Sequence, residues 1–417
     1  MTNVTLKAKL TNLAYALPII LITMYISYIA ITTFLKDVLT YRCTDICALM
    51  YSSATPVILL ATSIILGTGA SALYTDFVWS KGKGRALLAL ILLASAITNL
   101  TYAAIVNAID NPVSFVANAT LLWFTLGFLL GNLLTNAGLL ARYHYSVSRR
   151  GTLVGTGVTL GVILYLTLII VNYDIVKLSV IASIMAVTSA LLIACLGKLP
   201  KFNVEEGVSL YDIKILTLLI PLYIFFLAHG LIIGSHILPN ISSIIAGKLI
   251  SEVILALPMI LSALAGIVMD NLGRKIVGIA GVILLGITSV FMLTIYALII
   301  SPIELNIFML IFSRLSAALI VPYVIVVSAE IAPKKYAGRF LGICLSIVTC
   351  GILSGIVTPM MFRSFYFPTA IVTMALFISI YVLYLLPETL PPEYLRRREI
   401  TSYLKKAMKL TGKSKSS

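Results

Sequence analysis

The chain has 417 residues, of which 60% are hydrophobic and only 11% are charged, and its mean hydropathy is +1.08. A water-soluble globular domain carries about 25% charged residues, so this composition excludes a soluble protein and predicts an integral membrane protein. The formal net charge of +15 requires no nucleic-acid partner, because an inner leaflet rich in anionic lipid attracts the same cations.

Apolar runs long enough to cross a bilayer follow one another along the chain. They lie near residues 13–35, 54–75, 86–108, 117–140, 152–172, 177–197, 213–237, 243–268, 276–300, 305–328, 340–362 and 366–386. Lipid offers no hydrogen-bond partner to the backbone, so each run is predicted to be a helix. The sequence therefore predicts an all-α integral membrane protein with 12 transmembrane helices in two pseudo-symmetric six-helix bundles.

The longest hydrophilic link between the runs divides six spans from six. The predicted parts are an N-terminal bundle at 1–197, a cytoplasmic linker at 198–212, a C-terminal bundle at 213–388 and a basic tail at 389–417. The tail is either a helix on the membrane surface or a disordered segment. Most of the 30 lysines and arginines fall in alternate links and the tail. This bias predicts a multi-pass plasma-membrane protein with both termini in the cytoplasm.

A short charged link joins the runs 243–268 and 276–300. Gly266 allows its helix to approach a neighbour closely, and Asp270 can accept hydrogen bonds from the N-terminus of an adjacent helix. Gly273 suits a tight turn, and Arg274 and Lys275 can pair with acidic residues or with lipid phosphates. We interpret the link as a latch that holds one conformation. The alternative is that it only orients the hairpin and caps a helix.

Two other links resemble parts of this pattern. The first half has Asp76 and Arg85 around a longer turn, with Ala72 where the first pattern has glycine. Late in the second half, Glu330 is followed by Gly338-Arg339. We expect these residues to act at the same membrane face as Asp270, because all three links fall on the side that is predicted to be cytoplasmic.

Taken together, the links resemble those of the major facilitator superfamily of secondary transporters. The resemblance covers the whole chain in span count and symmetry. It is carried by Gly266…Asp270…Gly273-Arg274-Lys275, by the weaker copy around Asp76 and Arg85, and by Glu330-Ile331-Ala332-Pro333…Gly338-Arg339. Leu386-Pro387-Glu388-Thr389 after the last run is similar, more weakly, to a motif of sugar porters. The resemblance implies two bundles that rock about a central cavity bordered by spans seven, eight and ten.

Ionisable residues inside the spans are few. Counted at 1.5 Å per helical residue from the acidic residue at the end of each span, His229, Glu252 and Arg314 lie at about 25, 27 and 24 Å. An intramembrane charge by default marks a function or a partner. We expect Arg314 to pair with Glu252 across the cavity, and His229 or Glu252 to take up a coupling proton. A purely structural ion pair, or a pair of Glu252 with Lys248, is the alternative.

In the first half, the polar candidates for contact with a solute are Tyr25 and Asn136, although interhelical hydrogen bonding would explain them as well. The cysteines show no metal-ligand spacing, and Cys43 and Cys47 share one outer loop that oxidation could bridge. The chain lacks the Gly-Lys-Ser/Thr of a phosphate-binding loop, so direct coupling to ATP is not expected. No cofactor, no metal and no enzymatic activity are predicted.

The sequence thus predicts a secondary active transporter that works as a monomer. Its substrate would be a small molecule, such as a sugar, an organic anion or a similar metabolite, and a gradient of protons or another ion would drive it. Two alternatives stay open. One is an efflux antiporter for drugs or metabolites, and the other is a transporter-like sensor that binds a ligand without moving it.

Overall fold

The computed structural model describes residues 55–108, 112–144, 147–171, 175–195, 213–234, 256–298, 303–333, 336–361 and 366–390. All regular structure within these ranges is helical, as predicted. The described helices of the first half are α4 (Thr55–Ser80), α5 (Gly84–Ala108), α6 (Pro112–His144), η1 (Val147–Arg149), α7 (Arg150–Val171) and α8 (Ile175–Cys195). Those of the second half are α9 (Ile213–Gly234), η2 (Leu257–Leu261), α12 (Ser262–Leu272), α13 (Arg274–Leu298), α14 (Ile303–Ile331), α15 (Ala337–Met361) and α16 (Tyr366–Leu385).

The predicted runs from 54–75 onward overlap these helices, although the run 243–268 is described only from residue 256. Within the described residues, six segments are long and apolar enough to cross a membrane: Gly84–Ile105, Thr120–Tyr143, Arg274–Thr294, Phe308–Ile331, Ala337–Thr358 and Tyr366–Leu385. Shorter apolar helices lie at Ser179–Ala194, Thr217–Ile232 and Leu257–Leu272. The run 13–35, the link 198–212 and the tail beyond residue 390 lie outside the described residues, so the count of 12 spans stays a prediction.

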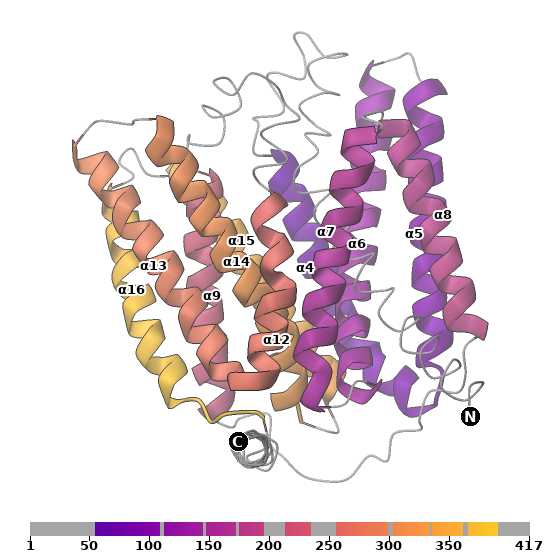
Figure 1. Ribbon diagram of the computed structural model, residues 1–417. Coiled ribbons are helices and arrows are strands. Elements are labelled where there is room, and N and C mark those ends of the chain that lie inside the picture. The colour runs from indigo at the N-terminus through magenta and orange to yellow at the C-terminus, as the bar shows by residue number, and fades with distance from the viewer. Residues whose placement is uncertain are drawn as a thin grey trace, which may run out of the picture.

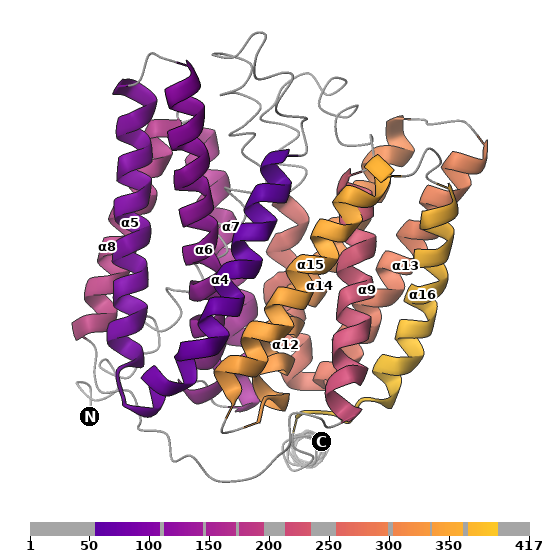
Figure 2. The same cartoon turned by 180° about the vertical axis from the view of Figure 1, so that it is seen from behind.

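The described helices form two groups that correspond to the two halves of the sequence. α4 packs against α6, and α5 against α6 and α8, whereas α9 packs against α15 and α16, and α13 against α14 and α16. Figures 1 and 2 show the halves side by side, with the indigo and magenta helices in one group and the orange and yellow helices in the other. The halves meet chiefly where α4 crosses α15 and where α7 crosses α12.

Large apolar side chains cover the outside of both groups. On α16, for example, Phe377, Tyr381 and Tyr384 are exposed. The interior instead contains many small polar residues, such as Ser71, Ser183 and Ser328, which are buried. An apolar exterior around a partly polar interior is expected of helices that pack together in lipid, because association there relies on close packing rather than on the hydrophobic effect.

Two glycines make the tight hairpins at one end of the helices. Gly273, between α12 and α13, has φ = 114°, and Gly82, between α4 and α5, has φ = 72°. Residues with a side chain rarely adopt this backbone conformation. The turn expected at Gly273 is therefore present. We call this end of the molecule, which carries Asp76, Asp270, Glu330 and Glu388, the polar rim.

Candidate functional site

Asp270, at the end of α12, binds the first turn of α7. Its Oδ1 accepts a hydrogen bond from the backbone N–H of Gly151 at 3.0 Å, and its Oδ2 accepts one from the N–H of Thr152 at 2.7 Å. The Thr152 hydroxyl donates a further bond to Oδ2, also at 2.7 Å. The first N–H groups of a helix have no partner within the helix and carry partial positive charge, so a carboxylate is favoured there. The contact expected of Asp270 is thus present, and it joins the two halves.

Glycines allow this contact to form. A Cβ at Gly266 would lie 2.2 Å from the carbonyl oxygen of Gly151, and a Cβ at Gly155 would lie 2.2 Å from that of Ser262. Both distances are far below van der Waals contact, so α7 and α12 touch backbone to backbone. The close approach that the sequence predicts at Gly266 is present, and α7 contributes its own glycines to it. We call this contact of α7 with α12 the Asp270 crossing.

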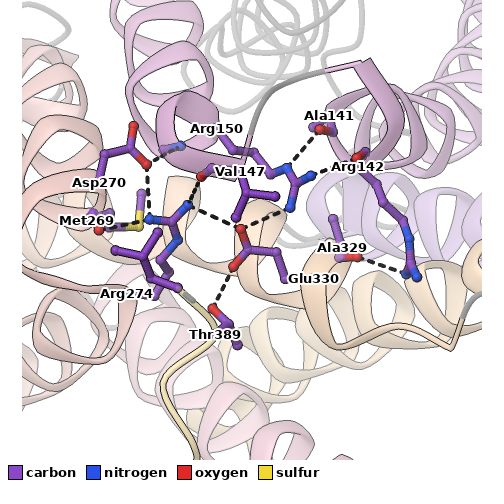
Figure 3. Close-up of polar contacts among 12 residues, drawn as sticks. Ala141, Arg142, Val147, Arg150, Met269, Asp270, Arg274, Ala329, Glu330 and Thr389 are labelled. Carbon is purple, nitrogen blue, oxygen red and sulfur yellow. Dashed lines mark hydrogen bonds and ion pairs between the residues drawn. The ribbon is translucent and has the colours of Figure 1, made fainter. Parts of the chain in front are cut away.

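Arg274 lies behind the Asp270 crossing in a buried network with two acidic residues (Figure 3). Its guanidinium is 3.1 Å from Asp270 Oδ1 and 3.2 Å from Glu330 Oε1. It also donates to the carbonyl of Met269 at 3.0 Å. Arg274 is only 1% exposed. We expected Arg274 to contact acidic residues or lipid phosphates, and the structure shows the first and excludes the second, because the side chain is enclosed by protein.

Glu330, at the end of α14, also binds an arginine from the other half. Arg150 Nη1 lies 2.9 Å from Glu330 Oε1, and the rest of its guanidinium donates to the carbonyls of Ala141 and Arg142. Arg150 is 5% exposed, and its burial lowers the pKa of the guanidinium while the charge of Glu330 opposes that shift. A buried carboxylate shared by two arginines is strongly held, and loss of any member would leave an uncompensated charge.

The segment after α16 also binds residues of this network. Glu388 accepts hydrogen bonds from the N–H groups of Arg274 and Lys275, at 2.9 and 3.1 Å, and so caps the N-terminus of α13. The next residue, Thr389, donates to Glu330 at 2.5 Å. Lys275 itself turns outward, with its ammonium 4.5 Å from the centre of the Tyr384 ring.

Asp76 makes the corresponding contact between α4 and α15. It accepts hydrogen bonds from the N–H groups of Gly338 at 2.6 Å and Arg339 at 3.0 Å. A Cβ at Gly342 would lie 2.6 Å from the Ala72 Cβ, so this glycine of the partner helix allows α15 to approach α4 closely. We call this contact of α4 with α15 the Asp76 crossing.

The charges around Asp76 differ from those around Asp270. Asp76 lies one residue beyond the predicted span 54–75. Burial raises its pKa above the ordinary value, although the two N–H bonds and the charges of Arg339 and Arg142 oppose the rise. The Arg339 side chain is exposed, with its guanidinium 5.3 Å from the Tyr336 ring. Arg85 lies in the first turn of α5.

The candidates inside the spans are only partly described. His229 is buried on α9, where Nδ1 lies 2.9 Å from the Ser313 hydroxyl and the ring stacks on Phe225. Arg314 follows Ser313 on α14, and its buried Nε has no hydrogen-bond partner in the described part of the chain. Glu252 and Tyr25 lie outside the described residues, so the expected pair of Arg314 with Glu252 stays a prediction.

Asn136 has both ends of its amide engaged within the first half. Its Oδ1 accepts a hydrogen bond from Trp79 Nε1 at 2.8 Å, and its Nδ2 donates to the carbonyl of Asn132 at 2.8 Å. The side chain is fully buried. The role in solute contact expected of Asn136 finds no support in these contacts, which instead fasten α4 to α6.

Several residues of the crossings were not predicted. Gly151, Thr152 and Gly155 on α7, and Arg142, which donates to the carbonyl of Ala329 at 2.9 Å, all join the halves. Four-residue spacing of glycine after a basic link, in Gly151…Gly155 and again in Gly338…Gly342, is the signal that could have found them. In the described ranges, no group of three histidine, cysteine or acidic residues could hold a metal ion.

Comparison with known proteins gives no match by sequence and clear matches by structure. No protein family and no curated protein matches the chain. The chain resembles the proton:xylose symporter XylE bound to 6-bromo-6-deoxy-D-glucose, with a TM-score of 0.72 and 15% identity over 91% of this chain and 96% of that one. It resembles the human organic anion transporter MFSD10 with a TM-score of 0.68 and 13% identity, over 90% and 99%.

A second structure of XylE, from E. coli in a partially occluded inward open conformation, matches with a TM-score of 0.62 and 17% identity over 92% and 97%. These likenesses show that the chain has the fold of these transporters, which the first of them names as that of the major facilitator superfamily, as the sequence predicts.

Proposed function

We propose that this protein is a multi-pass membrane transporter that moves a small solute by alternating access between its two halves. The observation that carries the proposal is that the described halves are joined at one rim by two equivalent helix crossings. Each crossing is held by a carboxylate on helix N–H groups, a contact that can separate without breaking either half. The fold shared with XylE and with MFSD10, which are a sugar symporter and an organic anion transporter, supports the same function.

The conformation described here is closed at the polar rim. Asp270, Asp76 and Glu330 each bind a group from the other half. We place this rim at the cytoplasmic face, as the distribution of lysine and arginine predicts. In support, the chain matches XylE in its sugar-bound structure better than XylE in its inward open conformation, with TM-scores of 0.72 and 0.62.

Opening of the rim would then be the step that releases solute to the cytoplasm. It requires Asp270 to leave the α7 N-terminus, Asp76 to leave the α15 N-terminus, and Arg150 to leave Glu330. In the open state these groups would be hydrated, and water replaces part of what each contact contributes. Arg339, which is exposed, and Lys275 and Arg85, which are partly exposed, are placed to bind anionic lipid headgroups in either state.

For the solute site, we propose the interior near His229 and Arg314. Small organic metabolites, either sugars or organic anions, are the solutes that we would test first. Proton uptake by His229 or Glu252 would couple transport to a pH gradient.

Uptake into proteoliposomes tests this proposal. The full chain is reconstituted, and radiolabelled xylose, glucose, lactate and citrate are offered with and without an inward proton gradient. We expect accumulation of at least one solute, increased by the gradient, and its loss in Glu330→Gln. Binding of a solute without accumulation would contradict transport and favour a sensor. Accumulation that rises when the gradient is reversed would identify an antiporter.

A further inference from the structure

Arg314 carries a charge deep within an apolar helix. It belongs to the membrane-spanning segment Phe308–Ile331, whose mean hydropathy is 2.2. Sixteen residues separate it from Glu330 at the polar rim, which corresponds to about 24 Å along a helix. A charge at this depth is costly and is retained only where it has a buried partner or binds a ligand.

The carboxylates of the rim cannot be that partner. Asp76, Asp270 and Glu388 each accept backbone N–H groups at helix N-termini, and Glu330 binds Arg150 and Arg274. All four lie at the far end of the helices from Arg314. Within the described residues, Nε of Arg314 has no hydrogen-bond partner.

The residues next to Arg314 in the sequence of α14 include two serines with described contacts. Ser313, directly before it, is bonded to Nδ1 of His229, and the Ser316 hydroxyl turns back to the carbonyl of Ser313. A Nδ1 atom held in this way leaves Nε2 of His229 as its second polar atom. The Arg314 guanidinium and the bonded pair of Ser313 with His229 thus lie at one level of the helices, and together they offer hydrogen-bond donors and a positive charge there.

We infer that Arg314 is the anion-binding group of the central site, and that the solute carries a carboxylate or phosphate group. A planar guanidinium binds such groups through two parallel N–H···O bonds, which a neutral hydroxyl or amide cannot match. The inference deepens the proposed function by naming the class of solute, and it rests on that function only for the movement of the solute. Binding itself can be tested without transport.

The test compares anions with neutral molecules of the same shape. Lactate and lactamide, gluconate and glucose, and glycerol 3-phosphate and glycerol are each added to the purified full chain in detergent, and the unfolding temperature is measured. We expect the anionic member of at least one pair to raise the unfolding temperature while its neutral partner does not. The rise should disappear in Arg314→Gln and be reduced in Arg314→Lys. Lys83→Gln, which removes one exposed cation between α4 and α5, is the charge-matched control and should respond like the unchanged protein.

Two results would overturn the inference. One is a panel in which no anion exceeds its neutral partner, and the other is an anion response that survives in Arg314→Gln. If anions bind through Arg314 but no solute accumulates in proteoliposomes, the inference holds and the proposed transport fails. If a neutral solute is accumulated equally by the unchanged protein and by Arg314→Gln, transport holds and the inference fails.

A second measurement needs no ligand. If Arg314 is an anion site, it has no tight partner when the site is empty, so Arg314→Gln should unfold at the same temperature as the unchanged protein or higher. If Arg314 instead belongs to a structural ion pair, removing it leaves a buried carboxylate without compensation, and the unfolding temperature should fall by several degrees.

Discussion

The Asp270 crossing and the Asp76 crossing use one spacing of residues in the two halves of the chain. On the helix that ends in the aspartate, a small residue recurs every four positions. On the partner helix, a glycine pair is followed, again after four positions, by a hydroxyl side chain. The matching rows are Ser262, Gly266 and Asp270 with Gly151, Gly155 and Thr159, and Thr68, Ala72 and Asp76 with Gly338, Gly342 and Ser346.

The hydroxyl ends of these rows also join the halves. At the Asp270 crossing, Thr159 donates to the carbonyl of Ile260 at 2.7 Å and accepts from the N–H of Ala263. At the Asp76 crossing, the Thr68 and Ser346 hydroxyls lie 2.6 Å apart. Each crossing therefore has a carboxylate at one end, backbone contact in the middle and a hydroxyl at the other end.

The surroundings of the two aspartates are nevertheless different. Four positions after Asp270 comes Arg274, whereas four positions after Asp76 comes Ser80. Tyr143 stands eight positions before Gly151 in the first half, and Glu330 stands eight positions before Gly338 in the second half. Glu330 belongs to a buried network of charges, whereas Tyr143 stacks on Trp79 with the two ring centroids 6.4 Å apart. One crossing is thus supported by ion pairs and the other by aromatic packing, and we expect them to respond differently to mutation.

The largest difference should follow from Glu330→Gln. The change removes the shared partner of Arg150 and Arg274 and leaves two buried guanidinium groups without it. We expect a loss of about 3–5 kcal/mol from the closed rim, by analogy with other broken buried ion pairs. Hydrogen–deuterium exchange of the first amides of α7 should accelerate strongly and that of α15 much less. Equal acceleration at both helices would show that the two crossings open as a single unit.

Gly266→Ala should have the next largest effect. Its Cβ would lie 2.2 Å from the Gly151 carbonyl oxygen, so α7 and α12 must move apart. Overpacking of this kind costs about 1–3 kcal/mol. The matched change in the first half, Ala72→Gly, removes a methyl group that Gly342 already accommodates and should alter stability much less. Thermal unfolding of both variants measures the difference, and a greater loss in Ala72→Gly would contradict the proposed equivalence.

Replacement of each aspartate by asparagine compares the crossings directly. Asp270→Asn weakens two charge-assisted N–H bonds and removes a partner of Arg274, so we expect a loss of about 2–3 kcal/mol. Asp76→Asn weakens the same kind of bonds, but it also removes a charge whose burial is unfavourable, so a loss below about 1 kcal/mol is expected. The two variants are compared by amide exchange at Thr152 and Arg339. An effect of Asp76→Asn as large as that of Asp270→Asn would mean that the charged network adds nothing to its crossing.

Trp79→Phe tests the aromatic support of the Asp76 crossing. The change keeps most of the packing and removes the N–H that binds Asn136, so the free energy of unfolding should fall by about 1 kcal/mol. Solute uptake should be unaffected, because Asn136 is assigned to packing rather than to the solute site. Loss of uptake with unchanged stability would return Asn136 to the list of solute contacts.

The smallest effect concerns pH. Burial raises the pKa of Asp76 in the closed state above the value that it has when hydrated. The closed state therefore binds a proton more readily, and a fall in pH from neutrality toward the ordinary pKa of an aspartate should favour closure at this crossing. When the pH falls from 7 to about 5, amide exchange at Gly338 should slow relative to amide exchange at Gly151. Asp76→Asn should remove this dependence.

Much of the fold could be predicted from the sequence, because hydropathy alone marks the spans in lipid. The chemistry of the second-half link could also be predicted, since Asp270, Gly273 and Arg274 act within a few residues of one another. Their partners could not be. Gly151 lies 119 residues from Asp270, and only the packing of the halves brings α7 to it.

Two partners lay beyond what the sequence shows. Ala72 stands where the second-half link has glycine, and it faces Gly342 on α15, 270 positions later in the chain. Asn136 was a candidate either for solute contact or for interhelical hydrogen bonding, and Trp79 at the end of α4 binds it. A single span shows which residues are polar, whereas the partner of each depends on which helix faces it.

Glu388 has one practical consequence. The segment that follows α16 binds the start of α13 through Glu388, and it binds Glu330 of the polar rim through Thr389. A reporter protein or purification tag fused before residue 390 would disturb these contacts and shift the equilibrium between the closed and the open conformation. The same fusion attached after the last residue of the chain should leave that balance as it is.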